Sequence, residues 1–316
     1  LFVWSVSTQA QQKTIAQKVD SVLQKMTLTE KIGQLNQYSG DWAHTGPITP
    51  DGDKQNQIRR GEVGSMLNVM GVEHTRMLQE LAMQSRLKIP LLYGQDVIHG
   101  FRTTFPIPLA QSCSWDLAAI EKAERIAGTE AAASGIHWTF SPMVDIARDA
   151  RWGRVMEGSG EDPYLGSRIA AARVRGFQGK GLGHTDAVMA CVKHFAAYGA
   201  AVAGRDYNDV DISDRSLWQY YLPPFKAAVD AGVASVMTAF NDINGIPATG
   251  NRYLLQTVLN QYWHFTGLVV SDWGSVGGMT AHGFTADDEA AAKAAIEAGC
   301  HMDMESRAYK KYLVKL

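Results

Sequence analysis

The stretch GLVVSD at residues 267–272 indicates how this chain folds. Leu268, Val269 and Val270 form a short apolar run, which predicts a strand buried on both faces of a parallel sheet. The run ends on Asp272, although a buried strand should not end on a charge without a reason. Because Asp is also a common helix N-cap, this position alone allows either a structural terminator or a catalytic group.

Similar short apolar runs recur along the chain, and helix-forming segments separate them. Alternation of this kind predicts right-handed crossovers and a parallel sheet. Between the runs, Ala-rich helices are expected at 114–135 and 286–299, each closed by a Gly in the left-handed cap position. The further strands are expected at 64–69, 90–96, 137–145, 187–195, 234–240 and 300–304.

Seven predicted strands are close to the eight of a closed α/β barrel. The predicted fold is therefore a complete or degenerate TIM-type (β/α)8 barrel, cut short at its C-terminal end. The alternative is a doubly wound open sheet, which usually carries a Gly-rich nucleotide-binding turn. The nearest match, GFQGKGLGHT at 176–185, has His184 in place of the last Gly and follows a helix, so it carries negligible weight.

The N-terminal region is expected to be helical over 14–37, before a Gly/Pro/Asp-rich loop at about 39–55. Thr27 and Glu30 form a capping-box pattern that begins a second helix, with Ile32 and Leu35 facing inward. Residues 1–12 resemble the tail of a secretory signal peptide, which predicts a periplasmic or secreted protein. The C-terminal AYKKYLVKL resembles the start of a helix, so we expect a fragment with a barrel domain at 13–316 and C-terminal domains missing.

Composition limits the kinds of partner. The 316 residues are 46% hydrophobic and 20% charged, with a formal net charge of -2. Because no basic face or long Lys/Arg run occurs, neither nucleic acid nor a membrane is expected as a partner. Cys113, Cys191 and Cys300 show no metal-binding or disulfide spacing and are interpreted as small buried hydrophobic residues.

Polar residues follow several predicted strands at the point where each strand ends. Active sites of parallel barrels lie at the C-terminal ends of the strands. Each residue alone has a structural interpretation, and for Arg151, Glu161 and Asp162 an ion-pair network within the loop is preferred. The residues at strand ends are Asp96, Lys193, His194, Asn241, Asp242 and Asp272, and the loop at 146–164 adds Arg151, Arg154, Glu157, Glu161 and Asp162.

Together these groups indicate a neutral, polyhydroxylated ligand. Carboxylates and cations bind hydroxyls through charge-assisted hydrogen bonds, and the nearby Trp152 and Trp273 offer aromatic faces for sugar rings. The nine histidines are scattered, so no metal site is expected, and no GxSxG nucleophile motif occurs. No cofactor is expected. A Schiff-base aldolase using Lys193 remains an alternative, because Lys193 lies at a strand end.

Six ordered motifs resemble those of the family 3 glycoside hydrolases, in particular the bacterial periplasmic β-glucosidases. The resemblance covers about residues 27 to 305. It implies an N-terminal barrel followed by an α/β sandwich domain, and retaining hydrolysis of terminal β-glycosidic bonds. The motifs are GQDVIHG (94–100), RWGRVMEGSGEDPYL (151–165), VKHFAAYG (192–199), GRDYN (204–208), VMTAFNDINGIPA (236–248) and GLVVSDWG (267–274).

The resemblance also assigns roles to residues. Asp272 corresponds to the catalytic nucleophile, whose pKa Lys193 and Arg154 would keep low. Phe240 stands where some relatives have a Tyr close to the nucleophile. The residues that correspond to sugar-hydroxyl ligands are Asp96, Arg154, Lys193 and His194, and those that correspond to walls of the sugar subsite are Met237 and Trp273.

A retaining mechanism needs a second carboxyl group as acid and base. In the β-glucosidases this is usually a Glu on the second domain, which would lie beyond Leu316. A hexosaminidase branch uses an Asp–His pair after the KHF motif, but the loop AAYGAAVAGRDYNDVD contains no His. The expected substrate is a β-glucoside or oligosaccharide, and a homodimer of the full-length protein is compatible with the resemblance. The alternatives are a β-xylosidase or a β-N-acetylhexosaminidase of the same family, and a non-catalytic sugar-binding fragment.

Overall fold

A computed structural model describes residues 13–41 and 52–316. The predicted signal-peptide tail at 1–12 and most of the predicted loop at 39–55 lie outside the described residues. The strands are β1 (Asn36–Ser39), β2 (Ser65–Leu67), β3 (Leu92–Gln95), β4 (Trp138–Thr139), β5 (Cys191–Phe195), β6 (Ser235–Thr238), β7 (Asp242–Ile243), β8 (Ile246–Pro247), β9 (Leu268–Val270) and β10 (Asp303–Met304).

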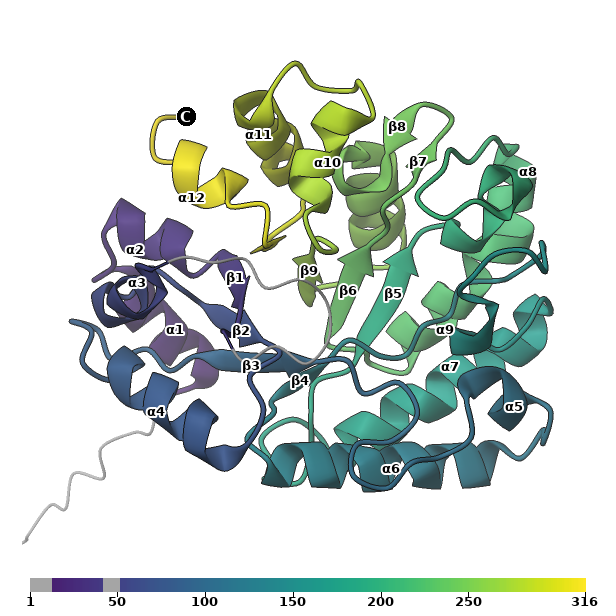
Figure 1. The fold of residues 1–316 in the computed structure, drawn as a ribbon, viewed down its shortest axis with the longest axis horizontal. Coiled ribbons are helices and arrows are strands. Elements are labelled where there is room, and N and C mark those ends of the chain that lie inside the picture. The colour runs from purple at the N-terminus through teal and green to yellow at the C-terminus, as the bar shows by residue number, and fades with distance from the viewer. Residues whose placement is uncertain (1–12, 42–51) are drawn as a thin grey trace, which may run out of the picture.

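Two parallel sheets occupy the centre of the molecule (Figure 1). Their strand orders are β10-β1-β2-β3-β4 and β5-β6-β9, and every pairing within them is parallel. Strands β7 and β8 form a separate antiparallel hairpin. The predicted α/β fold with a parallel sheet is therefore confirmed.

Isolated parallel bridges join the two sheets at their edges. Trp138 pairs with Met189 and Met143 with Lys193, which connects the β4 edge to the β5 edge. Between Val270 and Met302 a further bridge connects β9 to β10. Pro142 lies in the β4–β5 seam, where it has no N–H to donate, which is consistent with β4 being shorter than predicted.

The N-terminal helix prediction was only partly correct. Instead of one helical region to residue 37, the chain forms two short helices and then strand β1, whose Asn, Gln and Ser side chains gave no apolar run. The Thr27–Glu30 capping box is confirmed, because the Thr27 hydroxyl accepts from the Glu30 N–H and the Glu30 carboxylate accepts from the Thr27 N–H. Ile32 is buried as expected.

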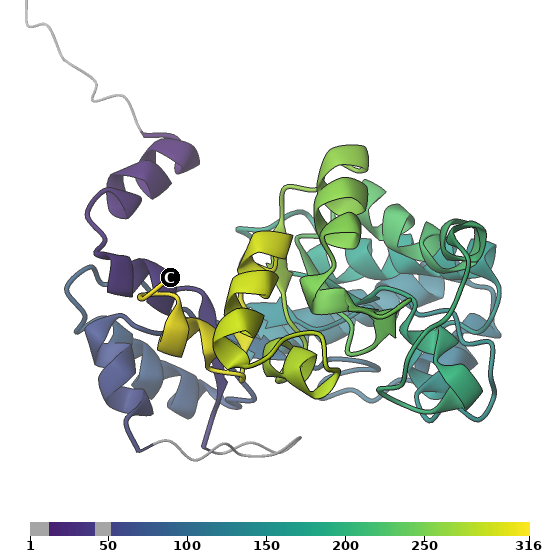
Figure 2. The ribbon, with the colours of Figure 1, turned by 90° about the horizontal axis from the view of Figure 1, so that it is seen from above.

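Helices surround the strands on their outer side (Figure 1), and α1 projects away from the rest of the structure (Figure 2). Gly135 after α6 and Gly299 after α11 both have positive φ, as predicted for the helix ends. The helices are α1 (Ile15–Leu23), α2 (Leu28–Gly33), α3 (Lys54–Arg60), α4 (Val72–Ala82), α5 (Pro108–Ser112), α6 (Leu117–Ala133), α7 (Pro163–Gln178), α8 (Asp214–Ser216), α9 (Pro223–Asp230), α10 (Ser275–Ala281), α11 (Asp288–Ala298) and α12 (Ala308–Tyr312), with a π-helical segment at Tyr253–Tyr262.

The apolar core has two parts. The larger part fills the space between strands and helices, and the smaller part is made of side chains from the strands and the residues next to them. Cys191 and Cys300 are buried as predicted, but the prediction for Cys113 was wrong, because its side chain is exposed after α5. Within the described part of the chain, no helix is long and apolar enough to cross a membrane. The smaller cluster comprises Leu67, Trp138, Phe140, Cys191, Met237, Val270, Met302 and Met304.

A buried ion pair joins α6 to α7. The Arg173 Nε lies 3.5 Å from Glu124 Oε1, both side chains are 1% exposed, and Arg173 Nη2 also donates to Gln111 at 2.9 Å. Burial raises the pKa of Glu124 to about 7. We expect Arg173→Met to lower the free energy of unfolding by about 3–5 kcal/mol, because Glu124 would lose its cation inside the core. Urea unfolding measures this change.

The control is the double variant Arg173→Met/Glu124→Gln, which removes both charges. Its stability should exceed that of Arg173→Met, since no unpaired charge remains buried. A double variant less stable than the single one would contradict this account of the pair.

Candidate active site

A cavity of about 320 Å³ opens at the C-terminal ends of the strands. Its floor includes apolar residues of the smaller core cluster, and its rim carries charged groups from several different strands. Strand ends therefore converge on one site, as the sequence predicted. The lining residues are Leu67, Asn68, Asp96, Ile98, Phe140, Arg154, Glu157, Lys193, His194, Tyr207, Met237, Phe240, Asp272, Trp273 and Met304.

All seven residues predicted for the site lie on this cavity. The structure thus brings together groups that are separated by up to 177 positions in the chain, from Asp96 to Trp273. Asn241 and Asp242 were also noted at a strand end, but they do not line it. Asp242 instead accepts from the backbone N–H of Val210, which is a structural contact. The seven are Asp96, Arg154, Lys193, His194, Met237, Asp272 and Trp273.

Asp272 follows β9 and is 8% exposed. Its Oδ1 accepts from the N–H of Trp273 at 2.7 Å, whereas its Oδ2 has no hydrogen-bond donor among the described residues. The expectation of a low pKa was wrong. Burial raises the pKa of Asp272 to about 6, and the opposing effects of Lys193 and Arg154 do not fully offset it. The carboxyl group is thus largely ionised at pH 7 and has one unpaired oxygen.

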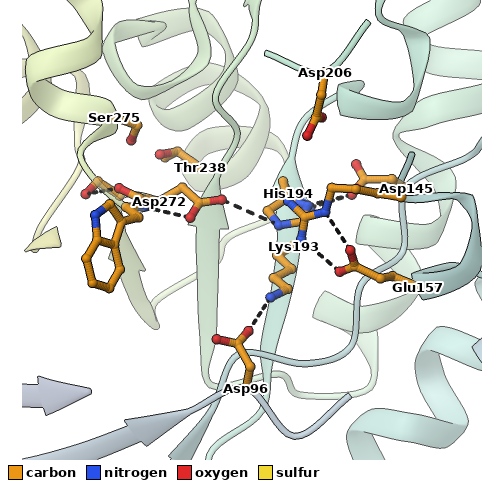
Figure 3. A network of polar contacts seen from close by, with 12 residues as sticks. Asp96, Asp145, Glu157, Lys193, His194, Asp206, Thr238, Asp272 and Ser275 are labelled. Carbon is orange, nitrogen blue, oxygen red and sulfur yellow. Dashed lines mark hydrogen bonds and ion pairs between the residues drawn. The ribbon is translucent and has the colours of Figure 1, made fainter. Parts of the chain in front are cut away.

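Lys193 and Asp96 form an ion pair across the cavity (Figure 3). The Lys193 ammonium donates to Asp96 Oδ1 at 2.6 Å. Lys193 is buried in β5, while the Asp96 side chain is 37% exposed after β3. The pairing shifts register between Val192 and Phe195, so Lys193 and His194 both line the same cavity, although neighbours on a regular strand point to opposite faces.

Arg154 is held by Glu157, which the sequence did not single out for the site. The two groups make a bidentate pair, with Nε and Nη2 donating at 2.7 and 2.8 Å. The guanidinium also lies 5.5 Å from the ring centroid of Tyr198. The sequence signal for this pair was the spacing of three residues between Arg154 and Glu157, but such spacing is equally typical of an ion pair on the surface.

The predicted loop network is divided into separate contacts. Arg151 pairs with Asp149 at 2.6 Å, while Asp162 caps α7 by accepting from Leu165 N–H. Trp152 was expected to face the ligand but is buried, and its Nε1 donates to Asp206 at 3.0 Å. Most charged residues of this loop therefore make local structural contacts, and the Arg154–Glu157 pair lines the cavity.

His194 is buried between two carboxyl groups (Figure 3). Its Nδ1 lies 2.8 Å from Asp145 Oδ2, and its Nε2 lies 3.5 Å from Asp272 Oδ2. Burial and the neighbouring Arg154 and Lys193 lower the pKa of His194 well below its usual value, so the ring is neutral. Asp145 was not singled out, although it ends the predicted strand 137–145; it does not line the cavity and contacts His194 behind it.

Aromatic side chains form part of the walls. Trp273 and Phe240 are half-buried, and Tyr207 is exposed at the rim, with its ring 4.7 Å from that of Phe240. Flat apolar faces beside charged groups suit a sugar ring, which has apolar faces and a polar edge. Across residues 13–41 and 52–316, no group of three His, Cys, Asp or Glu side chains is arranged to hold a metal ion.

Comparison with known proteins places these features in a family. The model of the glycosyl hydrolase family 3 N-terminal domain matches residues 27–316. A relative named periplasmic β-glucosidase, from Salmonella typhimurium, is 45% identical over 296 residues, covering 93% of this chain and 38% of the relative. A putative β-xylosidase from Formosa agariphila is 32% identical, covering 96% of this chain and 43% of the relative.

A solved structure gives the same result. The β-glucosidase from Listeria innocua, in complex with isofagomine, superposes with a TM-score of 0.89 at 43% identity and covers 94% of this chain. The alignment covers 42% of that enzyme, so this chain spans about two fifths of the length of the relatives it matches. The chain belongs to glycosyl hydrolase family 3, and its residues 27–316 match the N-terminal domain of that family.

Proposed function

We propose that the strands close into a (β/α)8 barrel over residues 13–316, as the catalytic domain of a longer enzyme. The parallel bridges at both seams between the two sheets support closure, because they leave neither edge of the two sheets unpaired. The partial coverage of the relatives supports a longer protein. The relative from Salmonella, by its name, supports a periplasmic or secreted location.

The function that the site favours is retaining, exo-acting hydrolysis of terminal β-glucosides, with Asp272 as nucleophile. The unpaired Oδ2 of Asp272 carries this proposal, because Asp272 lines the cavity and a nucleophilic oxygen must be ionised and free of donors that would lower its reactivity. Relatives named β-glucosidases support glucose as the sugar, and Listeria structures hold glucose and, in a variant, laminaribiose.

The other predicted residues would bind the sugar. Asp96, Lys193 and His194 offer acceptors and donors for hydroxyls, and Arg154 adds a fixed cation. Met237 and Trp273 would form walls against the apolar faces of the ring. Because these contacts hold the anomeric carbon against Asp272, they position the substrate and also stabilise the transition state.

The acid and base are proposed to come from outside these residues. Besides Asp272, the carboxyl groups of the described residues that line the cavity are Asp96 and Glu157. Asp96 is bound to Lys193, and both oxygens of Glu157 are bound to Arg154. Each is therefore already engaged in an ion pair within the site, and the second carboxyl should lie about 5 Å from the nucleophile. A residue beyond Leu316 in the full-length enzyme would fill this role.

Covalent trapping tests the nucleophile. The full-length protein is incubated with a 2-deoxy-2-fluoro-β-glucoside that carries a good leaving group, and the labelled peptide is identified by mass spectrometry. We expect one 2-fluoroglucosyl group on Asp272, because the fluorine slows hydrolysis of the glycosyl-enzyme more than it prevents its formation. The matching 2-fluoro-β-xyloside should label more slowly. Label on any other residue would overturn the assignment.

A further inference from the structure

Asp145 is completely buried behind the cavity and does not line it. Its Oδ2 receives two contacts from His194: the backbone N–H at 3.0 Å and the ring Nδ1 at 2.8 Å. A backbone N–H can only donate, so Oδ2 is an acceptor whatever the charge of the carboxyl group. Burial raises the pKa of Asp145 to about 7. In the ionised form the carboxylate has no proton to donate, so the Nδ1 that shares this oxygen carries the proton.

This contact sets the state of the other ring nitrogen. A neutral imidazole has one N–H, so a proton on Nδ1 leaves Nε2 as an acceptor. Nε2 faces Asp272 Oδ2 at 3.5 Å, and that oxygen has no donor among the residues the structure describes. In the opposite tautomer, the N–H of Nε2 would point at this oxygen and donate to it.

We propose that Asp145 is a positioning residue that fixes the tautomer of His194 and so keeps the attacking oxygen of Asp272 free of a protein donor. Nε2 is then available to accept a hydrogen bond from a sugar hydroxyl. This inference rests on the proposed role of Asp272 as nucleophile. A donor on Asp272 Oδ2 would stabilise its charge, lowering both its pKa and its reactivity toward the anomeric carbon.

Two substitutions in the full-length enzyme distinguish the hydrogen-bond acceptor of Asp145 from its negative charge. Asp145→Leu has the same shape but no acceptor, so His194 can adopt the Nε2–H tautomer and donate to Asp272. The acidic limb of the kcat/KM profile, which reports the pKa of Asp272, should move to lower pH by about one unit, with kcat reduced at least about tenfold. In Asp145→Asn the amide oxygen still accepts from Nδ1, so the limb should stay in place.

Apart from Asp145 itself, the charged groups around the site are unchanged in both variants. An acidic limb that does not move in Asp145→Leu would overturn the proposal, and so would an equal shift in Asp145→Asn, which would make the charge of Asp145 the cause. A merely structural role would lower activity without moving the limb. The unchanged groups facing His194 and Asp272 are Asp96, Arg154, Glu157, Lys193 and Tyr207.

A direct observation covers the case in which Asp145→Leu does not fold. A neutron crystal structure of the parent enzyme should show deuterium on Nδ1 of His194 and none on Nε2. Deuterium on Nε2 would overturn the proposal. This readout needs no turnover, so it is independent of the trapping experiment. Failure to label Asp272 would refute the proposed function, whereas the neutron structure would still decide the tautomer of His194.

Discussion

Replacing Asp272 by Gly in the full-length enzyme is expected to lower kcat for aryl β-glucosides on the order of 10⁴-fold, because the covalent intermediate can no longer form. The rest of the cavity should persist, since among the described residues the Asp272 carboxylate accepts one hydrogen bond, from the neighbouring Trp273 N–H. Steady-state kinetics with 2,4-dinitrophenyl β-glucoside measures the loss.

Added azide should restore turnover of this substrate in Asp272→Gly. A small anion can occupy the space of the lost carboxylate and attack the same face of the sugar, so the product should be the α-glucosyl azide. The matched control is Asp242→Asn, a change at another strand end outside the cavity, which should keep activity within a few fold of the parent. A β-configured azide product, or full activity in Asp272→Gly, would contradict the nucleophile assignment.

The location of the site was predictable because parallel strands share a direction. In a parallel sheet the carboxyl ends of the strands lie at one edge, so Asp96, Lys193 and Asp272 had to approach one another once each strand was recognised. The apolar runs made most strands recognisable. Strand β1 was missed because Asn36, Gln37 and Ser39 are buried through hydrogen bonds and pairing with both neighbours, which no hydrophobic pattern reports.

Other features depend on packing that sequence spacing does not encode. Two Arg residues of the loop differ in this way: Arg154 lines the cavity and pairs with Glu157, whereas Arg151 is exposed and pairs with Asp149. The pKa of Asp272 was predicted in the wrong direction because its cationic neighbours were considered, whereas the desolvation of a carboxyl group at the end of a buried strand was not. Asp145 ends the predicted strand 137–145, as Asp96 and Asp272 end theirs, but its contact with His194 could not be predicted from the sequence.

Replacing Lys193 by Met should lower kcat/KM at pH 7 by about 10²–10³-fold and move the acidic limb of the pH profile to higher pH. Lys193 is the largest favourable influence on the ionised form of Asp272. Without that positive charge the pKa of Asp272 rises above about 6, and less of the nucleophile is ionised at each pH. The substitution also leaves Asp96 without its partner, which disturbs the sugar-binding side of the cavity.

The control for Lys193→Met is Lys193→Arg, which keeps the charge but not the point geometry of the ammonium group. Its kcat/KM should also fall, because the Asp96 contact is reshaped, while its acidic limb should stay close to that of the parent. An unmoved limb in Lys193→Met, or an equal shift in both variants, would contradict an electrostatic role. The expected shift is opposite in direction to that of Asp145→Leu. One series of pH profiles therefore separates the two influences on Asp272: a cation that keeps it ionised, and an imidazole prevented from donating to it.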